Sequence, residues 1–235
     1  MIRLENITCS HRTGAKSTLV LDDVSVTLPT DRRFVVLGHS GSGKSTLIRL
    51  LSSSMIPDHG FVTRSVRVSY PVGFRGGLTA SLSPKQNIEY ACDIYDADYE
   101  EVLDFVARVT GFSKELDKPF SGLSTTSRIK FAFALSYAMP FDTYLIDGAF
   151  AGGDRNFRGR CLQMLEARLA KGGMIMATSQ PRVAAMLGDS GAVLYGGKLY
   201  VYNDIKIALA RFAELGPDPV ARGEIEIDGD LDDEL

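Results

Sequence analysis

One short segment of the chain combines glycines with a lysine and hydroxyl side chains at a spacing that suits phosphate binding. Residues 38–46 match the pattern GxxxxGK followed by serine or threonine. The backbone N–H groups of such a loop surround phosphate oxygens, and the lysine adds a positive charge beside them. The segment therefore predicts a site for a nucleoside triphosphate. Its residues are Gly38, His39, Ser40, Gly41, Ser42, Gly43, Lys44, Ser45 and Thr46.

Each residue type in this phosphate-binding loop (P-loop) has a chemical role. Gly38, Gly41 and Gly43 allow positive φ and a close approach of backbone to phosphate, which a Cβ would obstruct. Lys44 is the expected electrophile beside the β and γ phosphates. The Ser45 hydroxyl is the expected Mg²⁺ ligand.

The elements around the loop are those that a P-loop needs. The apolar run 33–37 reads as a strand that enters the loop, and residues 45–51 leave it with helical spacing. A helix that starts there points its N-terminus at the bound anion. The alternative is a glycine- and serine-rich turn that matches the pattern by chance, and the flanking strand and helix argue against it.

Composition places the chain among globular proteins of a reducing compartment. With 235 residues, of which 45% are hydrophobic, it can form one large domain or two small ones. Cys9, Cys92 and Cys161 are odd in number and widely spaced, which suggests neither a disulfide framework nor a zinc site. We expect no signal peptide at residues 1–6. We also expect no membrane span, because charges and a proline interrupt the apolar segment 129–146.

The C-terminal residues differ from the rest in charge. From Glu224 the sequence contains seven acids and no base, so we expect residues 223–235 to form a solvated, disordered tail. Without these seven acids the net charge changes from −3 to +4. That excess is too small and too diffuse to predict nucleic-acid binding.

The first half of the chain reads as strands followed by an inserted helical region. Segments 2–8 and 19–28 predict an antiparallel pair around a turn at 13–15, and a short strand is expected near 62–68. Ser83 with Pro84 and Gln86 predicts a capped helix start. Asp98 begins a second helix, which Gly111 ends. These helices predict a subdomain at about residues 82–138.

The second half returns to α/β alternation, and we find no internal repeat. The predicted elements are a strand at 143–146 that ends in Asp147, a helix at 155–170, a strand at 174–178, a hairpin at 192–195 and 199–202, and a helix at 204–215.

Segments outside the P-loop carry a further pattern that a generic P-loop enzyme is not expected to share. With them, residues 1–215 resemble the nucleotide-binding subunit of an ABC transporter, in the branch that exports capsular and related bacterial polysaccharides. The resemblance implies an α/β fold: a P-loop NTPase core of ABC type at 1–222 with an antiparallel β edge and the inserted helical subdomain. The segments are 88–95, 103–106, 131–136, 144–147, 153–154, 191–194 and 196–199.

The resemblance also implies cofactors, partners and roles. ATP and Mg²⁺ are the expected cofactors, and a second ATP-binding subunit and an integral membrane permease are the expected partners. Each ATP would lie between one P-loop and the signature segment of the other subunit, at the cytoplasmic face of the inner membrane. Asp147 aligns with the aspartate that orients Mg²⁺; an ordinary strand-end aspartate is the alternative. His11 stands near the position of the aromatic residue that stacks on adenine.

Several functional positions depart from the family pattern. Gly148 stands where the family has a glutamate that polarises the attacking water, Ser179 where it has the switch histidine, and Thr79 where it has the glutamine of the loop before the helical subdomain. Thr126 replaces the signature glycine; its β-branched side chain adds bulk and resists left-handed backbone. Residues 121–124 offer a shifted substitute for that glycine.

Three hypotheses follow. The chain is a working transport ATPase in which Asp154 or another acid replaces the glutamate, or a nucleotide-binding subunit or regulator with little or no hydrolysis, or a soluble P-loop kinase or GTPase. The resemblance favours the polysaccharide-export ATP-binding subunit. Gly148, Thr126 and Ser179 predict weak or absent turnover, since assistance to the attacking group contributes about 10²–10⁴-fold in rate.

Overall fold

The fold is described from a computed structural model of the chain. It covers residues 1–13, 16–72, 78–148 and 172–222, and, between 149 and 171, only residues 157, 159, 163 and 164. The hairpin turn at 14–15, Asp154 and the acidic tail lie outside the described residues. So does most of the helix predicted at 155–170, of which the four described residues are helical.

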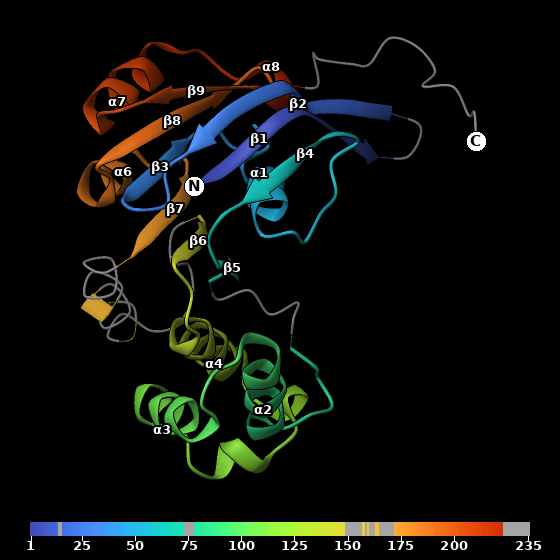
Figure 1. The fold of residues 1–235 in the computed structure, drawn as a ribbon, viewed down its shortest axis with the longest axis vertical. Coiled ribbons are helices and arrows are strands. Elements are labelled where there is room, and N and C mark those ends of the chain that lie inside the picture. The colour runs from blue at the N-terminus through green and yellow to red at the C-terminus, as the bar shows by residue number, and fades with distance from the viewer. Residues whose placement is uncertain are drawn as a thin grey trace.

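A six-stranded sheet forms the centre of the structure (Figure 1). Its strand order is β5-β6-β7-β3-β8-β9; all neighbours pair in parallel except β8 and β9, which form the predicted hairpin. The predicted α/β fold class is confirmed. The strands are β3 (Arg33–Leu37), β5 (Val68–Pro71), β6 (Thr143–Asp147), β7 (Gly173–Thr178), β8 (Ser190–Tyr195) and β9 (Lys198–Tyr202).

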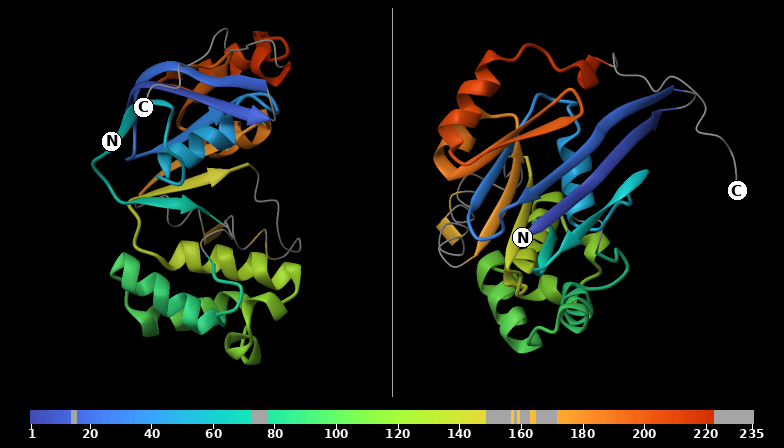
Figure 2. Two further views of the ribbon diagram at one scale, coloured as in Figure 1. Left: turned by 90° about the vertical axis from the view of Figure 1, so that its right-hand side faces the viewer. Right: turned by 45° about the horizontal axis from the view of Figure 1, so that its top comes forward.

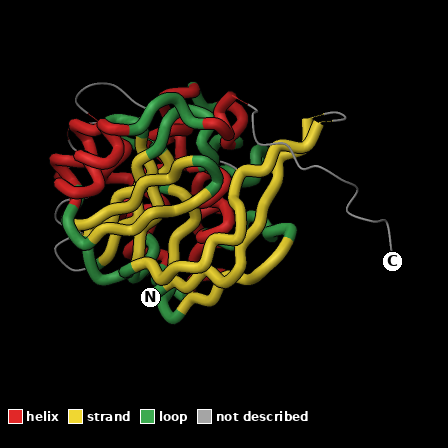
Figure 3. Tube along the Cα trace, turned by 90° about the horizontal axis from the view of Figure 1, so that it is seen from above, coloured by secondary structure: helices red, strands yellow, loops and turns green. Residues whose placement is uncertain are grey.

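A second sheet contains three antiparallel strands in the order β2-β1-β4. The predicted pairing of the two N-terminal strands is confirmed, and both are longer than expected: Thr13 still pairs with Lys16 beside the turn. The far part of this hairpin projects from the body of the molecule (Figure 3). The strands are β1 (Ile2–Thr13), β2 (Lys16–Leu28) and β4 (His59–Arg64).

Both faces of the central sheet are buried, because side chains alternate along β3. Phe34 and Val36 face a core shared with α1 and the three-stranded sheet, whereas Val35 and Leu37 face α6 and α7. Such two-sided burial explains why the central strands read as continuous apolar runs. The helices are α1 (Lys44–Leu51), α6 (Pro181–Leu187) and α7 (Ile205–Glu214), and a short helix α8 (Pro219–Arg222) follows.

The chain between β5 and β6 forms a separate helical layer below the sheets (Figure 2). Its apolar core includes Ile88, Val106 and Phe131, and Tyr144 of β6 joins it to the central sheet. All three α-helices of the layer lie within the span 82–138 predicted for a helical subdomain. They are α2 (Pro84–Tyr95), α3 (Tyr99–Thr110) and α4 (Thr125–Ala138), with 3₁₀ turns η1 (Lys114–Asp117) and η2 (Phe120–Gly122).

The predicted helix ends in this layer are confirmed. Ser83 Oγ accepts a hydrogen bond from the backbone N–H of Gln86, whose side chain accepts one from the Ser83 N–H. This reciprocal capping box satisfies two donors that the helix leaves free. Asp98 caps α3 by accepting from the Glu101 N–H at 2.8 Å, and Gly111 ends α3 with φ +74°.

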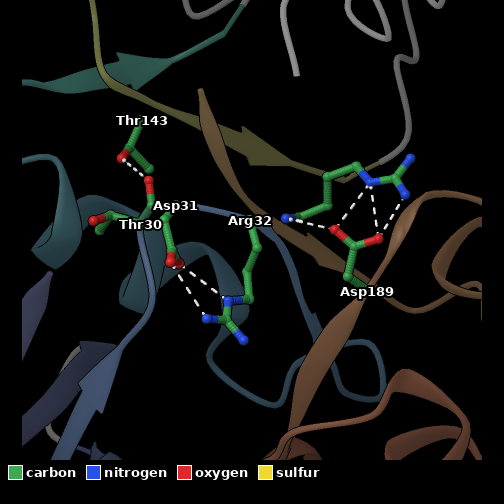
Figure 4. A network of polar contacts seen from close by, with 6 residues as sticks. Thr30, Asp31, Arg32, Thr143 and Asp189 are labelled. Carbon is green, nitrogen blue, oxygen red and sulfur yellow. Dashed lines mark hydrogen bonds and ion pairs between the residues drawn. The ribbon is translucent and has the colours of Figure 1, made fainter. Parts of the chain in front are cut away.

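Polar contacts join the amino ends of three central strands (Figure 4). The backbone N–H and guanidinium of Arg33 donate to Asp189, with Arg33 Nη2 and Asp189 Oδ1 2.5 Å apart. These hydrogen bonds hold the pKa of Asp189 below its usual value. The Thr143 hydroxyl donates to the carbonyl of Thr30 at 3.2 Å. The starts of β3, β6 and β8 are therefore fixed together, at the edge opposite the P-loop.

One predicted element is wrong. The single strand expected near 62–68 is two strands, β4 and β5, which belong to different sheets. Apolar content alone does not show where a chain crosses from one sheet to another. Among the described residues, no helix is both long enough and apolar enough to cross a bilayer.

Candidate functional site

The candidate site lies where three neighbouring parallel strands end. Leu37 of β3, Thr178 of β7 and Asp147 of β6 terminate at the same edge, because the register pairs Leu37 with Thr178 and Asp147 with Ala177. The Gly38 N–H donates to the carbonyl of Thr178, which ties the P-loop to β7. Ligands of open α/β sheets bind at this edge.

The glycines of the P-loop meet two different requirements. Gly41 and Gly43 have φ of +84° and +95°, which side-chain-bearing residues disfavour. Gly38 does not have positive φ; instead a Cβ there would lie 2.5 Å from the Ser42 hydroxyl oxygen. A Cβ at Gly43 would lie 2.3 Å from Cγ1 of Val20. The loop is therefore too tightly folded for side chains at these positions.

Helix α1 begins at this loop without a capping side chain. Its N-cap, Gly43, has no side chain to accept from the first turn, and that turn contains no acid. The first N–H groups of a helix have no partner within the helix and attract anions. Because Leu47 is the first to bond back, to the Gly43 carbonyl, the preceding N–H groups remain available for phosphate oxygens.

Lys44 completes the anion site. Its ammonium donates to the carbonyls of Gly38 and His39 at 2.9 and 2.6 Å, which leaves one of its three N–H donors for a ligand. Burial lowers the pKa of Lys44, and the nearby carboxylates of Asp147 and Asp218 oppose that shift. The charge of Asp147 therefore acts at the site.

The residues present suit Mg²⁺ bound together with phosphate. Ser45 lines the pocket and Asp147 is exposed at the end of β6. A hydroxyl and one carboxylate are what Mg²⁺ takes from a protein when phosphate oxygens and waters supply its other ligands. No cluster of three or more His, Cys, Asp or Glu side chains occurs among the described residues, so a metal held by protein alone is not indicated there.

A pocket of about 470 Å³ opens above the P-loop. His11, for which a base-stacking position is predicted, lines it, and so does Ser179, which follows β7. The P-loop residues that line it are Ser40, Gly41, Gly43, Lys44, Ser45 and Thr46. The others are His11, Thr18, Val20, Ser179 and Val220.

Three predicted P-loop residues are not among the described lining residues of this pocket. Gly38 is enclosed, Ser42 is fully buried, and the His39 ring packs on Phe212 of α7, with centroids 4.8 Å apart. The motif therefore places the backbone of these residues at the site, whereas the Ser42 hydroxyl and the His39 ring do not line the pocket.

Gly148, in the place of the family's glutamate, has left-handed backbone with φ +81°. Its N–H donates to the carbonyl of Ala177 at 2.8 Å, and a Cβ built on it would meet no atom within 4 Å. Among the described residues nothing obstructs a side chain here; the backbone conformation disfavours one.

The expectation that position 126 needs left-handed backbone is wrong. Thr126 lies in the first turn of α4, exposed and in ordinary helical geometry, and Ser124 caps that helix by accepting from the Ser127 N–H. The other part of the prediction is unaffected, because a threonine at this helix start is still bulkier than the family's glycine. Gly122 belongs to η2, before α4 begins, so residues 121–124 do not provide a shifted glycine inside the helix start.

Thr79 is exposed, and a residue that the sequence analysis did not single out holds it. Asn87 of α2, 2% exposed, accepts from the Thr79 N–H at 2.8 Å and donates to the carbonyls of Thr79 and Ser83 at 3.1 and 3.0 Å. The signal was available, since a polar residue on the buried face of a predicted helix requires partners.

Replacing Asn87 with leucine should lower the free energy of unfolding by about 1–3 kcal/mol, because the Thr79 N–H and the loop carbonyls lose their partner. Urea unfolding followed by circular dichroism measures the change. The exposed Asn203 provides a matched control, and its replacement by leucine should have little effect. Equal stability of the two variants would show that the loop does not depend on Asn87.

Two further residues near the site were also missed. Val220 lines the pocket, and Asp218 is fully buried close to Lys44. The Asp-Pro pair at 218–219 is a helix-start signal, but it follows Gly216 and Pro217, which end the predicted helix at 204–215.

Comparisons with known proteins agree with this geometry. A family model described as "ABC transporter" matches residues 21–151, more than half of the chain. The chain is 31% identical to the ATP-binding protein BexA of Haemophilus influenzae, over 91% of this chain and 99% of that protein. It is 33% identical to the polysialic acid transport ATP-binding protein KpsT of Escherichia coli, over 90% of this chain and 98% of KpsT. It is 31% identical to the capsule polysaccharide export ATP-binding protein CtrD of Neisseria meningitidis, over 92% of this chain and 100% of CtrD.

Solved structures show the same fold at lower identity. The ATP-binding cassette MJ0796, in a dimeric post-hydrolysis state with ADP and Pi, aligns with a TM-score of 0.71 at 17% identity, over 87% of this chain and 99% of that one. Taken with the family model and with relatives matched over nine-tenths of the chain, the site described above shows that this protein belongs to the ABC transporter family.

Proposed function

We propose that this chain is the ATP-binding subunit of a bacterial ABC transporter that exports a capsular or related polysaccharide, and that it binds MgATP at the P-loop. The uncapped start of α1, behind a glycine loop and beside the Lys44 ammonium, is the observation that carries ATP binding. The named functions of the relatives BexA, KpsT and CtrD support the choice of cargo.

The proposed partners are a second ATP-binding subunit and an integral membrane permease. In this arrangement the chain is peripheral, at the cytoplasmic face of the inner membrane. ATP bound between two subunits closes the dimer, and closure is transmitted to the permease. The dimeric state named for the solved cassette MJ0796 supports this assembly.

A second candidate function is a nucleotide-binding subunit with little or no hydrolysis. The left-handed backbone of Gly148 favours it, because no carboxylate is present there to orient water. Thr126 and Ser179 replace two more groups of the family pattern. Pairing with an intact partner does not restore turnover: one composite site would contain this chain's Gly148 and the other its altered signature segment.

Deleting the gene in its own host should remove the polysaccharide from the cell surface, because export depends on the ATP-binding subunit. The wild-type gene should restore it and the Lys44→Ala gene should not, as measured by carbohydrate analysis of the cell surface. Lys206→Ala, an exposed lysine of α7, serves as the matched control. A deletion strain with normal surface polysaccharide would contradict the proposed export function.

A further inference from the structure

The chain returns to the nucleotide pocket after the last helix of the central fold. Beyond α7 it passes through Gly216 and Pro217 and forms α8, which packs beside β2 (Figure 1). Val220 of α8 is 5% exposed, and it lines the same pocket as Lys44 and His11. A residue near the C-terminal end of the described chain thus contacts the space above a loop that lies about 180 positions earlier.

A buried carboxylate holds this segment in place. Asp218 is fully buried; its Oδ1 accepts from the Val220 N–H at 2.9 Å, and its Oδ2 accepts from the Gly196 N–H at 3.4 Å. Gly196 belongs to the turn between β8 and β9. Asp218 therefore joins α8 to the central sheet, and buried carboxylates persist only where such donors satisfy them.

The same turn is joined to β2, which carries another wall of the pocket. The Asp22 N–H donates to the carbonyl of Gly197 at 2.9 Å, and Lys198 Nζ donates to the carbonyl of Asp22 at 2.7 Å. Val20, two residues before Asp22, lines the pocket beside the P-loop. Hydrogen bonds consequently connect three segments on this side of the pocket: strand β2, the β8–β9 turn and residues 218–220.

The residues that line the pocket are of two chemical kinds. The P-loop and the start of α1 supply N–H groups and the Lys44 ammonium, which suit phosphates. His11, Val20 and Val220 supply an aromatic ring and apolar side chains, which suit the faces of a planar heterocycle. A base bound in this pocket is expected to contact the second kind of group, to which Val220 belongs.

We propose that Val220 forms part of the base subsite and that Asp218 is the positioning residue that holds it there. Residues 216–222 are then a component of the nucleotide site. The proposal rests on the proposed function, because it requires that the pocket bind a nucleoside triphosphate. It goes further by assigning a specificity role to a segment outside the P-loop motif and beyond residues 1–215, which carry the family resemblance.

The proposal is tested by calorimetric titration of the full-length protein with ATP and, separately, with inorganic tripolyphosphate. Tripolyphosphate has no base, so it is expected to contact only the P-loop and the start of α1. Val220→Ala should weaken ATP binding about three- to tenfold, as expected for lost apolar contact, and should leave tripolyphosphate binding unchanged. Val220→Ile, which fills part of the subsite without opening the fold, should also weaken ATP binding selectively. Val109→Ala is the matched control: it removes the same groups from a 6% exposed valine of α3.

Asp218 is tested by rescue. Asp218→Ala should weaken ATP binding as Val220→Ala does, whereas Asp218→Asn should retain part of it, because the amide oxygen still accepts from the Val220 N–H while the amide NH2 cannot accept from the Gly196 N–H. Equal ATP affinity in wild type and both Val220 variants would overturn the assignment, as would equal loss of ATP and tripolyphosphate binding. Failure of the wild type to bind either ligand would instead overturn the proposed function itself.

Discussion

Lys44→Ala should abolish detectable MgATP binding. The substitution removes the charged donor of the P-loop, and charge-assisted hydrogen bonds contribute about 1.5–3 kcal/mol each. It also removes the contacts by which the ammonium holds the carbonyls of Gly38 and His39. The two losses together should lower the affinity by about 100-fold or more.

Thermal unfolding with and without millimolar MgATP measures this effect. A ligand at about 100 times its Kd stabilises the folded state by about 2.7 kcal/mol, which raises the melting temperature by several degrees. Wild type and Lys206→Ala should show that rise, and Lys44→Ala should not. An equal rise in Lys44→Ala would show that the nucleotide binds away from the P-loop.

The wild-type chain should release phosphate from ATP at a rate close to that of Lys44→Ala, even with the permease and partner present. Loss of the assisting carboxylate alone costs about 10²–10⁴-fold in rate, and the switch histidine is replaced by Ser179. A steady-state phosphate assay with both proteins measures the difference. Rapid phosphate release by wild type, absent in Lys44→Ala, would show that another acid performs the role of the missing glutamate.

Gly148→Glu should not restore turnover, and the physical reason is the backbone. A glutamate at φ +81° is strained by about 1–2 kcal/mol; relief of the strain would disturb the hydrogen bond from the residue 148 N–H to the Ala177 carbonyl. Gly111→Glu is a matched control, since Gly111 also has positive φ with no atom within 4 Å of a built Cβ. Both variants should lose similar stability. Full activity in Gly148→Glu would show that the other replacements are harmless.

The sequence predicted those parts of the site that depend on local chemistry. The P-loop and the capping of α2 and α3 follow from residue types a few positions apart, and the structure forms each of them. Thr126 was misjudged because the family pattern was applied to a position where the local sequence simply starts a helix. His39 was assigned to the ligand, whereas contact with Phe212, far along the chain, turns its ring elsewhere.

The parts that were missed depend on contacts between distant segments. Asn87 binds a loop whose course the sequence does not specify, and Val220 reaches the pocket only because Asp218 is held by the β8–β9 turn. Periodicity shows that a polar residue such as Asn87 on a buried helix face requires partners, but it does not show which distant segment supplies them. Two short strands that follow one another, β4 and β5, are assigned to different sheets for the same reason: their partners are chosen by the tertiary fold.

Strand β7 sets the width of the active edge. It lies between β6, which ends in Asp147, and β3, which leads into the P-loop. Two strand spacings amount to about 9–10 Å, too far for direct contact between the two and suited to an intervening phosphate with a hydrated cation. None of the residues of β7 is among the described lining residues of the pocket, yet the strand acts as the spacer between Asp147 and the P-loop. Buried substitutions such as those at Met174 or Met176 would therefore alter the gap without altering any group that faces the nucleotide.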